Sequence, residues 1–173
     1  MLGVKDLRIV PARGEENADA SLGPEALVKA LSMAKAREVA AQCGPDDTVI
    51  GADTIVWFQN RVFGKPKTRE EAAEMLRALS GETHQVFTGV TVIRGESVLS
   101  GAEMSYVHFR RLSEREIWAY IATGEPMDKA GAYGAQGLAA LFVRGIDGDF
   151  FNVMGLPLCR LGEMLKLQGV ELL

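Results

Sequence analysis

The sequence predicts an α+β or mixed-sheet α/β domain. Apolar residues recur at helical spacing between residues 24 and 42, which favours a helix with one buried face. Two strand-like stretches, 83–94 and 98–109, follow each other across a short turn, which favours an antiparallel pair. Because helices and antiparallel strands are mixed along the chain, this fold class is the expected one.

The first third of the chain predicts a strand, a helix and a hairpin. Residues 7–10 are typical of a short strand, and the polar stretch 11–23 is rich in turn formers. Pro24 suits the first position of a helix that continues to about residue 42. Residues 48–58 form a central strand, and 61–66 form a short return across a two-residue turn.

A second helix and the long strand pair follow. Thr68 and Glu71 have the spacing of a capping box, and Gly81 is a typical residue at a helix end. The sequence therefore predicts a helix between them, followed by antiparallel strands at 83–94 and 98–109.

The last third predicts two more helices with a strand between them. Ser113 and Glu116 form a second capping box, and Gly124 ends that helix. Residues 138–143 are apolar and are expected to form a final strand. Pro157 begins the terminal helix.

Composition narrows the function classes. The 173 residues, 47% of them apolar, fit a single domain, and the net charge of −4 with mixed signs argues against a dedicated nucleic-acid binder. No apolar run approaches the ~20 residues of a membrane span, and the start lacks the layout of a signal peptide, so a cytoplasmic protein is expected. Neither a disulfide framework nor a zinc site is indicated by Cys43, Cys159, His84 and His108.

Asp53 is the first candidate functional residue. It lies within the apolar stretch 49–58, where an unpaired charge would cost several kcal/mol. The carboxylate therefore needs hydrogen-bonding or charged partners, or a catalytic or binding role. One alternative is a purely structural hydrogen bond to Thr54 or to a turn amide.

Three glycine-rich segments place polar groups where a ligand can approach the backbone: 51–54, 63–66 and 128–137. Each has a structural alternative. Lys65 precedes a proline, where a lysine is usually only solvated. Gln136 lies between two glycines, where its amide could simply hold a turn.

Two further candidates precede these segments. Lys35 lies at the edge of the first helix's apolar stripe, where snorkelling alone would explain it, and Glu16 belongs to an acidic pair in a polar loop. Brought to one cleft, two carboxylates and two lysines would match a Mg²⁺–polyphosphate site. A Ser/His/Asp catalytic triad is disfavoured, because both histidines lie in strand-like stretches without a nucleophile elbow nearby.

Five motifs in order carry a resemblance to a known family: "GADTIV", "GKP", "LSGETHQVFTGV", "TGEPMDKAGAYGAQG" and "IDGDFFNVMGLPL". With them the chain resembles the Maf family of nucleoside triphosphate pyrophosphatases, also called septum formation inhibitors. The resemblance implies an inosine-triphosphatase-like fold, with a mixed twisted sheet, flanking helices and two lobes around a cleft. It also implies hydrolysis of a nucleoside triphosphate to its monophosphate and pyrophosphate, with Mg²⁺ or Mn²⁺ as the metal.

The resemblance implies roles for four residues. Asp53 is similar to the family's proton acceptor, which takes a proton from the attacking water and also faces the metal. Lys35 and Lys65 resemble the phosphate-contacting lysines, and Glu16 resembles the acidic residue on the metal side.

Substrate choice is implied by two further residues. Thr54 and Gln136 resemble the subgroup that acts on dTTP and UTP, whereas the 7-methyl-GTP subgroup carries a different residue after the aspartate. An amide offers both a donor and an acceptor to a base edge, which suits this selection. The expected partner is therefore a nucleotide, without nucleic acid or membrane, and a homodimer is consistent with the family.

The start of the chain departs from the family pattern. Residues 1–173 are expected to form a single Maf-like domain that lacks the first strand and the S-x-S-P-R-R turn, which supplies arginines to the triphosphate. Ala135 also stands where the family usually has isoleucine. A misassigned or shortened start is the favoured explanation. The alternative function is a catalytically impaired nucleotide-binding or cell-division regulatory protein.

Overall fold

The computed structural model describes residues 4, 7–14 and 22–172. Five strands form one sheet in the order β2-β1-β3-β4-β5, and all four ladders are antiparallel. The strands are β1 (Thr48–Phe58), β2 (Arg61–Phe63), β3 (Thr83–Arg94), β4 (Ser97–Phe109) and β5 (Val143–Asp147). The predicted mixture of helices with an antiparallel strand pair is confirmed. Among the described strands, however, β3 and not β1 occupies the centre of the sheet.

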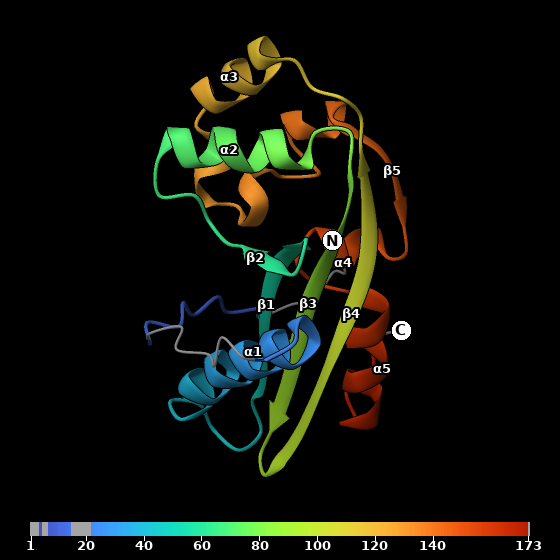
Figure 1. Cartoon of the computed structure of the whole chain (residues 1–173). Helices are drawn as coiled ribbons and strands as arrows, with labels where there is room; N and C mark the ends of the chain where they lie inside the picture. Colours follow the sequence, from blue (N-terminus) through green and yellow to red (C-terminus); the bar gives the residue numbers. More distant parts are fainter. Residues whose placement is uncertain (1–3, 5–6, 15–21, 173) are drawn as a thin grey trace.

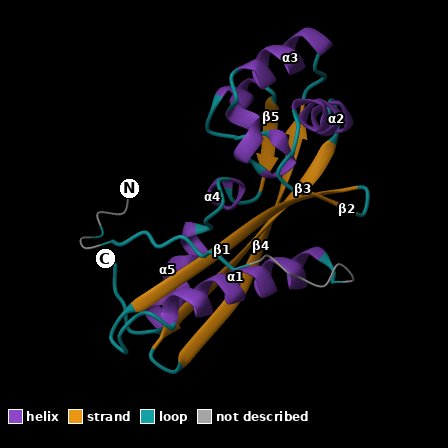
Figure 2. Ribbon diagram, turned by 90° about the vertical axis from the view of Figure 1, so that its left-hand side faces the viewer, coloured by secondary structure: helices purple, strands orange, loops and turns teal. Residues whose placement is uncertain are grey.

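The helices form two groups at the two ends of the long strands (Figure 1). One group contains α1 and α5, and the other contains α2, α3 and the short 3₁₀ segments (Figures 1 and 2). The α-helices are α1 (Pro24–Ala40), α2 (Arg69–Leu79), α3 (Glu114–Ala122), α4 (Phe150–Val153) and α5 (Leu158–Leu167). The 3₁₀ helices are η1 (Glu125–Asp128), η2 (Ala130–Ala132) and η3 (Leu138–Leu141). The two groups agree with the two expected lobes, and the missing first strand stays a prediction.

Helices α1 and α5 cover opposite faces of the sheet. Ile55 of β1 packs in one cluster with Leu27, Val28 and Leu31 of α1. Ala52, an odd number of residues earlier on the same strand, packs with Val90, Val92 and the apolar side of α5. Because successive side chains of a strand point to opposite faces, the sheet is buried on both sides here. None of the helices within residues 22–172 combines the length and apolar character needed to cross a bilayer.

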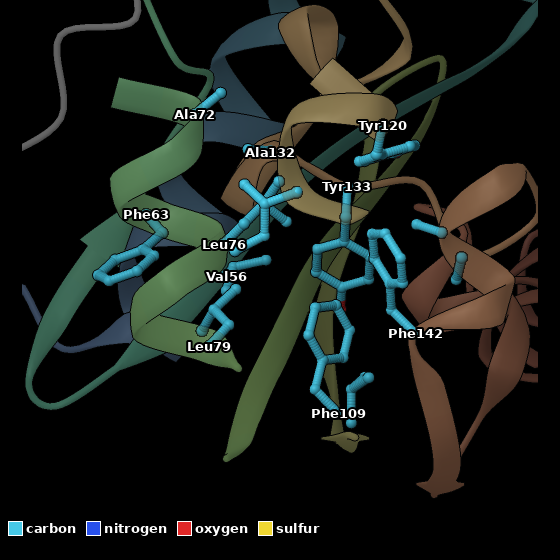
Figure 3. Close-up of a cluster of buried hydrophobic side chains, with 14 of the residues drawn as sticks. Val56, Phe63, Ala72, Leu76, Leu79, Phe109, Tyr120, Ala132, Tyr133 and Phe142 are labelled. Atoms are coloured by element: carbon cyan, nitrogen blue, oxygen red, sulfur yellow. The ribbon is translucent and has the colours of Figure 1, made fainter. Parts of the chain in front are cut away.

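The largest core lies in the other group of elements (Figure 3). Figure 3 shows Leu76 and Leu79 of α2 on one side of this core and the rings of Phe109, Tyr133 and Phe142 on the other. The Phe109 and Tyr133 ring centroids are 4.8 Å apart in an edge-on arrangement, which is favourable for aromatic pairs. This core joins α2 and α3 to the strand ends.

The local sequence signals for the hairpin turn and for one of the two capping boxes are confirmed. Gln59 and Asn60 both have positive φ, 49° and 56°, as a tight hairpin turn requires. Ser113 and Glu116 form both halves of their capping box. The box at Thr68 forms only in part: the hydroxyl accepts from the Glu71 amide, but the Glu71 carboxylate accepts from Lys67 N instead.

The strand expected at residues 7–10 is wrong. This described segment is assigned to no strand, and Ile9 is 86% exposed. A strand needs a neighbour to satisfy its backbone groups, and a short apolar run does not by itself supply one.

The strand expected at residues 138–143 is also wrong. Leu138–Leu141 form the 3₁₀ helix η3, and β5 begins only at Val143. Ala139 and Phe142, three residues apart, are buried, whereas Leu138 and Leu141 are exposed. The burial period is therefore three, which fits a 3₁₀ turn and not a strand.

Candidate active site

Asp53 lies on β1, directly opposite Gly89 of β3. Its side chain points to the sheet face that carries α1, because Ile55, two residues further along, packs against that helix. The side chain is 10% exposed. The carboxylate is therefore held between the sheet and α1 at the border of the interior.

Helix α1 approaches this part of the sheet at two glycines. A Cβ on Gly89 would lie 2.0 Å from the carbonyl oxygen of Val28, and a Cβ on Gly51 would lie 2.5 Å from that of Ser32. Real Cβ atoms do not come so close, so only glycine permits this packing distance. The glycines fix the position of α1 over β1 and β3.

Lys35 of α1 forms an ion pair and hydrogen bond with Oδ1 of Asp53. The Lys35 side chain is 29% exposed, and its ammonium group points toward the largely buried carboxylate of Asp53. Pairing offsets the cost of burying both charges. The structure thus brings these two candidate residues together, and snorkelling into solvent is not the main role of Lys35.

Thr54 points to the opposite face of the sheet. Its hydroxyl lies 2.8 Å from that of Thr88, which in turn donates to the Asn152 carbonyl oxygen at 2.9 Å. The alternative in which Thr54 serves as the hydrogen-bond partner of Asp53 is therefore wrong. The Thr54 hydroxyl connects β1 to the α4 segment instead.

Lys65 lies just beyond β2 and is exposed. Its neighbour Gly64 accepts a 3.0 Å hydrogen bond from Gly131 N, which joins two of the three glycine-rich segments. A hydrogen bond from Lys129, assisted by the charge of Lys65, lowers the pKa of Asp128 below its ordinary value. The segment that carries Lys65 is therefore joined to the segment that carries Asp128 and Lys129, which the sequence around Lys65 did not indicate.

The third segment also contacts β1. A Cβ on Gly131 would lie 2.8 Å from Cγ2 of Val56, so this backbone rests on the strand that carries Asp53. All three glycine-rich segments are thus joined around β1, a contact that spacing in the sequence could not establish. Whether Lys65 and Gln136 reach the carboxylate of Asp53 stays a prediction.

Gln136 is exposed on a tight turn. Gly137 N donates to Gly134 O at 3.0 Å and closes this turn. Beneath it lies Glu125, whose carboxylate accepts a hydrogen bond from Leu138 N. Sequence reasoning missed Glu125; the glycines at 134 and 137 were its only signal.

Asp53 is the described carboxylate that the sequence assigns to a metal. Within residues 22–172 no three His, Cys, Asp or Glu side chains form a metal cage. Mg²⁺ does not need one, because it usually binds one or two carboxylates together with substrate phosphates and water. The donor chemistry of Asp53 therefore fits Mg²⁺, whereas Glu16 lies outside the described residues.

Comparison with known proteins identifies the family. The family model described as "Maf-like protein" matches residues 1–168. The chain belongs to the Maf family. The resemblance inferred from its five motifs is thereby confirmed.

Several known proteins are similar to this one over most of its length. A dTTP/UTP pyrophosphatase of Moorella thermoacetica is 51% identical over 166 residues, covering 94% of this chain and 84% of that protein. Another of that name from Geobacillus sp. (strain WCH70) is 49% identical and covers 98% of this chain and 91% of its own. A third, from Thermococcus gammatolerans, is 46% identical, with 98% and 89% covered.

Proposed function

We propose that this Maf protein hydrolyses dTTP and UTP to the nucleoside monophosphate and pyrophosphate. The observation that carries the proposal is the 51% identity, over 94% of the chain, to a protein named dTTP/UTP pyrophosphatase. The Asp53–Lys35 pair supports it, because it places a carboxylate and an ammonium group together at the edge of the interior.

In the proposed reaction Asp53 acts as general base. Its carboxylate accepts a proton from the water that attacks the α-phosphorus, and the bond from that phosphorus to the bridging oxygen breaks as pyrophosphate leaves. Lys35 holds the carboxylate in place, and its positive charge neutralises a phosphate oxygen of the substrate. Lys65 contributes a second positive charge toward the phosphates.

We propose a divalent cation, Mg²⁺ or Mn²⁺, as the cofactor. Asp53 and Glu16 are the residues that would hold it, together with phosphate oxygens of the substrate. The cation would neutralise charge on the phosphates when bound.

Base selection is assigned to Gln136. Its exposed amide can present a donor and an acceptor to the edge of thymine or uracil at once. Any contribution of Thr54 to this choice would be indirect, because its hydroxyl is bonded to Thr88 on the other face of the sheet.

The proposed setting is the reducing cytoplasm, with the protein as a homodimer. Cys43 and Cys159 are both free thiols, which suits a reducing compartment. The homodimer rests on the family resemblance alone.

The test is pyrophosphate release from dTTP in the presence of Mg²⁺. Asp53→Asn removes the proton acceptor with little change of shape, so turnover should fall at least ~100-fold. Affinity for an α,β-methylene analogue of dTTP, measured by calorimetry, should remain near that of the parent. The matched control is Asp46→Asn, in the exposed turn before β1, which should hydrolyse dTTP at the parent rate.

The outcomes separate the two candidate functions. Hydrolysis by Asp53→Asn at the parent rate would remove Asp53 from the mechanism. A parent protein that binds the analogue but releases no pyrophosphate from dTTP or UTP would favour the nucleotide-binding, regulatory alternative.

A further inference from the structure

Glu125 supports the turn that carries Gln136. It is the first residue of η1, and its Oε2 accepts a 3.1 Å hydrogen bond from Leu138 N. Its other oxygen, Oε1, accepts a 2.9 Å hydrogen bond from the hydroxyl of Tyr120. Both carboxylate oxygens are therefore engaged with groups around one turn.

Tyr120 ties the other end of the same turn. Its hydroxyl accepts a 3.2 Å hydrogen bond from Gly134 N while it donates to Glu125. Burial raises the pKa of Tyr120, so the phenol keeps the proton that it donates. The pair Tyr120–Glu125 thus holds the backbone amides of residues 134 and 138, four positions apart, on either side of Gln136.

The turn rests directly on the Glu125 carboxylate. A Cβ on Gly137 would lie 2.1 Å from Oε1 of Glu125, and a Cβ on Gly134 would lie 3.6 Å from it. Any side chain at position 137 would separate the turn and the carboxylate, because one of the two would have to move. Gln136 is exposed immediately before this contact, so the location of its amide depends on Glu125.

We propose that Glu125, together with Tyr120, is a positioning residue for base selection by Gln136. The inference rests on the proposed function. An amide distinguishes donor from acceptor on a base edge only when it is held to within about 0.5 Å of the right place. A turn anchored at both ends on one carboxylate–phenol pair provides this restraint without touching the nucleotide.

The experiment measures kcat and KM for dTTP and for dCTP, whose base edges present opposite donor and acceptor patterns at position 4. Glu125→Ala should lower the dTTP preference roughly 10-fold, chiefly through KM for dTTP. Tyr120→Phe removes one anchor and should give a smaller fall. Glu125→Gln keeps an acceptor for Leu138 N and should recover most of the preference.

A double-mutant cycle separates positioning from general stability. If Glu125 acts through Gln136, Glu125→Ala should cause no further loss of preference in a Gln136→Ala background. A purely structural role would instead lower activity with both nucleotides equally and additively. Glu114→Ala, which removes an exposed acid paired with Arg77, is the matched control and should keep the parent preference.

Amide exchange and equilibrium binding report on the turn and on base preference independently of turnover. Amide hydrogen exchange at Gly134 and Leu138 should accelerate in Glu125→Ala, and the soluble Tyr120→Phe and Glu125→Gln proteins remain informative if the alanine variant does not fold. Equilibrium binding of dTTP and dCTP tests the preference without turnover, so failure of the proposed hydrolysis is seen separately. A parent-like preference in Glu125→Ala, or additivity with Gln136→Ala, would overturn the inference.

Discussion

At the scale of single residues, His84 shows how the interior changes a titratable group. It is 1% exposed and lies edge-on to Phe109 and Tyr133, with Nε2 2.8 Å from the Tyr133 hydroxyl. Burial, with a smaller contribution from the charge of His108, lowers the pKa of His84 from 6.5 to about 4. The folded protein therefore holds His84 neutral at neutral pH.

This pKa predicts a loss of stability in acid. Between pH 6.5 and about 4 the unfolded chain binds a proton at His84 that the folded chain does not. The free energy of unfolding therefore decreases as the pH is lowered through this range. The full effect is about 3 kcal/mol near pH 4. Urea unfolding across this range should show it in the parent and in the His108→Gln control, but not in His84→Phe. An equal acid loss in His84→Phe would show that other groups cause it.

At the scale of elements, the contact of α1 with the sheet determines the geometry of the candidate site. Val28 and Ser32 place their carbonyl oxygens where side chains at Gly89 and Gly51 would otherwise stand. Lys35 reaches Asp53 only because the helix lies this close. The packing of one helix on two strands thus couples the stability of the fold to the candidate active site.

The change Gly89→Ala tests this coupling. The added methyl group would lie 2.0 Å from the Val28 carbonyl oxygen, so α1 has to move away from β3. We expect a loss of about 3 kcal/mol in urea unfolding and a clear fall in dTTP hydrolysis.

Gly162→Ala in α5 is the matched control, because its added Cβ meets nothing within 4 Å. It should raise stability by up to about 1 kcal/mol, as alanine favours helix over glycine. Parent-like stability and hydrolysis in Gly89→Ala would show that α1 does not rest on the sheet as described.

At the scale of the whole molecule, the two groups of elements both contribute to the proposed nucleotide site. Asp53 and Lys35 belong to the sheet and α1, whereas Gln136 belongs to the segment joined to the α2–α3 core. Asp53 is linked to that segment through β1, since Gly131 packs on Val56. A bound nucleotide is therefore expected to stabilise both groups together.

We expect a Mg²⁺-dependent rise in the melting temperature with an α,β-methylene analogue of dTTP. Ligand at 100 times its Kd stabilises the folded state by about 2.7 kcal/mol, which is a shift of several degrees for a chain of this size. EDTA should abolish the shift, whereas Asp53→Asn with Mg²⁺ should still show it, because the affinity of this variant for the analogue is expected to stay near that of the parent. A full shift in EDTA would contradict the metal proposal.

Local chemistry made much of the fold predictable. Ser113 with Glu116 marked a helix start through hydrogen bonds between near neighbours, and Gln59–Asn60 marked a turn through the left-handed conformations that asparagine tolerates. The wrong secondary-structure predictions concern segments whose packing partners lie far away in sequence. The apolar residues at 138–143 suit either a strand or a 3₁₀ turn, and contact with the α2–α3 core decides between them.

The sequence by itself determined that Asp53 needs a partner, because a carboxylate in an apolar strand is costly to bury. It did not determine which face of the sheet that carboxylate uses, that Thr54 turns away from it, or that Glu125 lies beneath Gln136. Only the tertiary structure decided these points. Gly51 of β1 and Gly89 of β3 allow α1 to pack closely on the sheet, and Glu125 contacts the 134–138 turn. Both contacts join residues that are distant in sequence but close in space, so spacing along the chain does not reveal them.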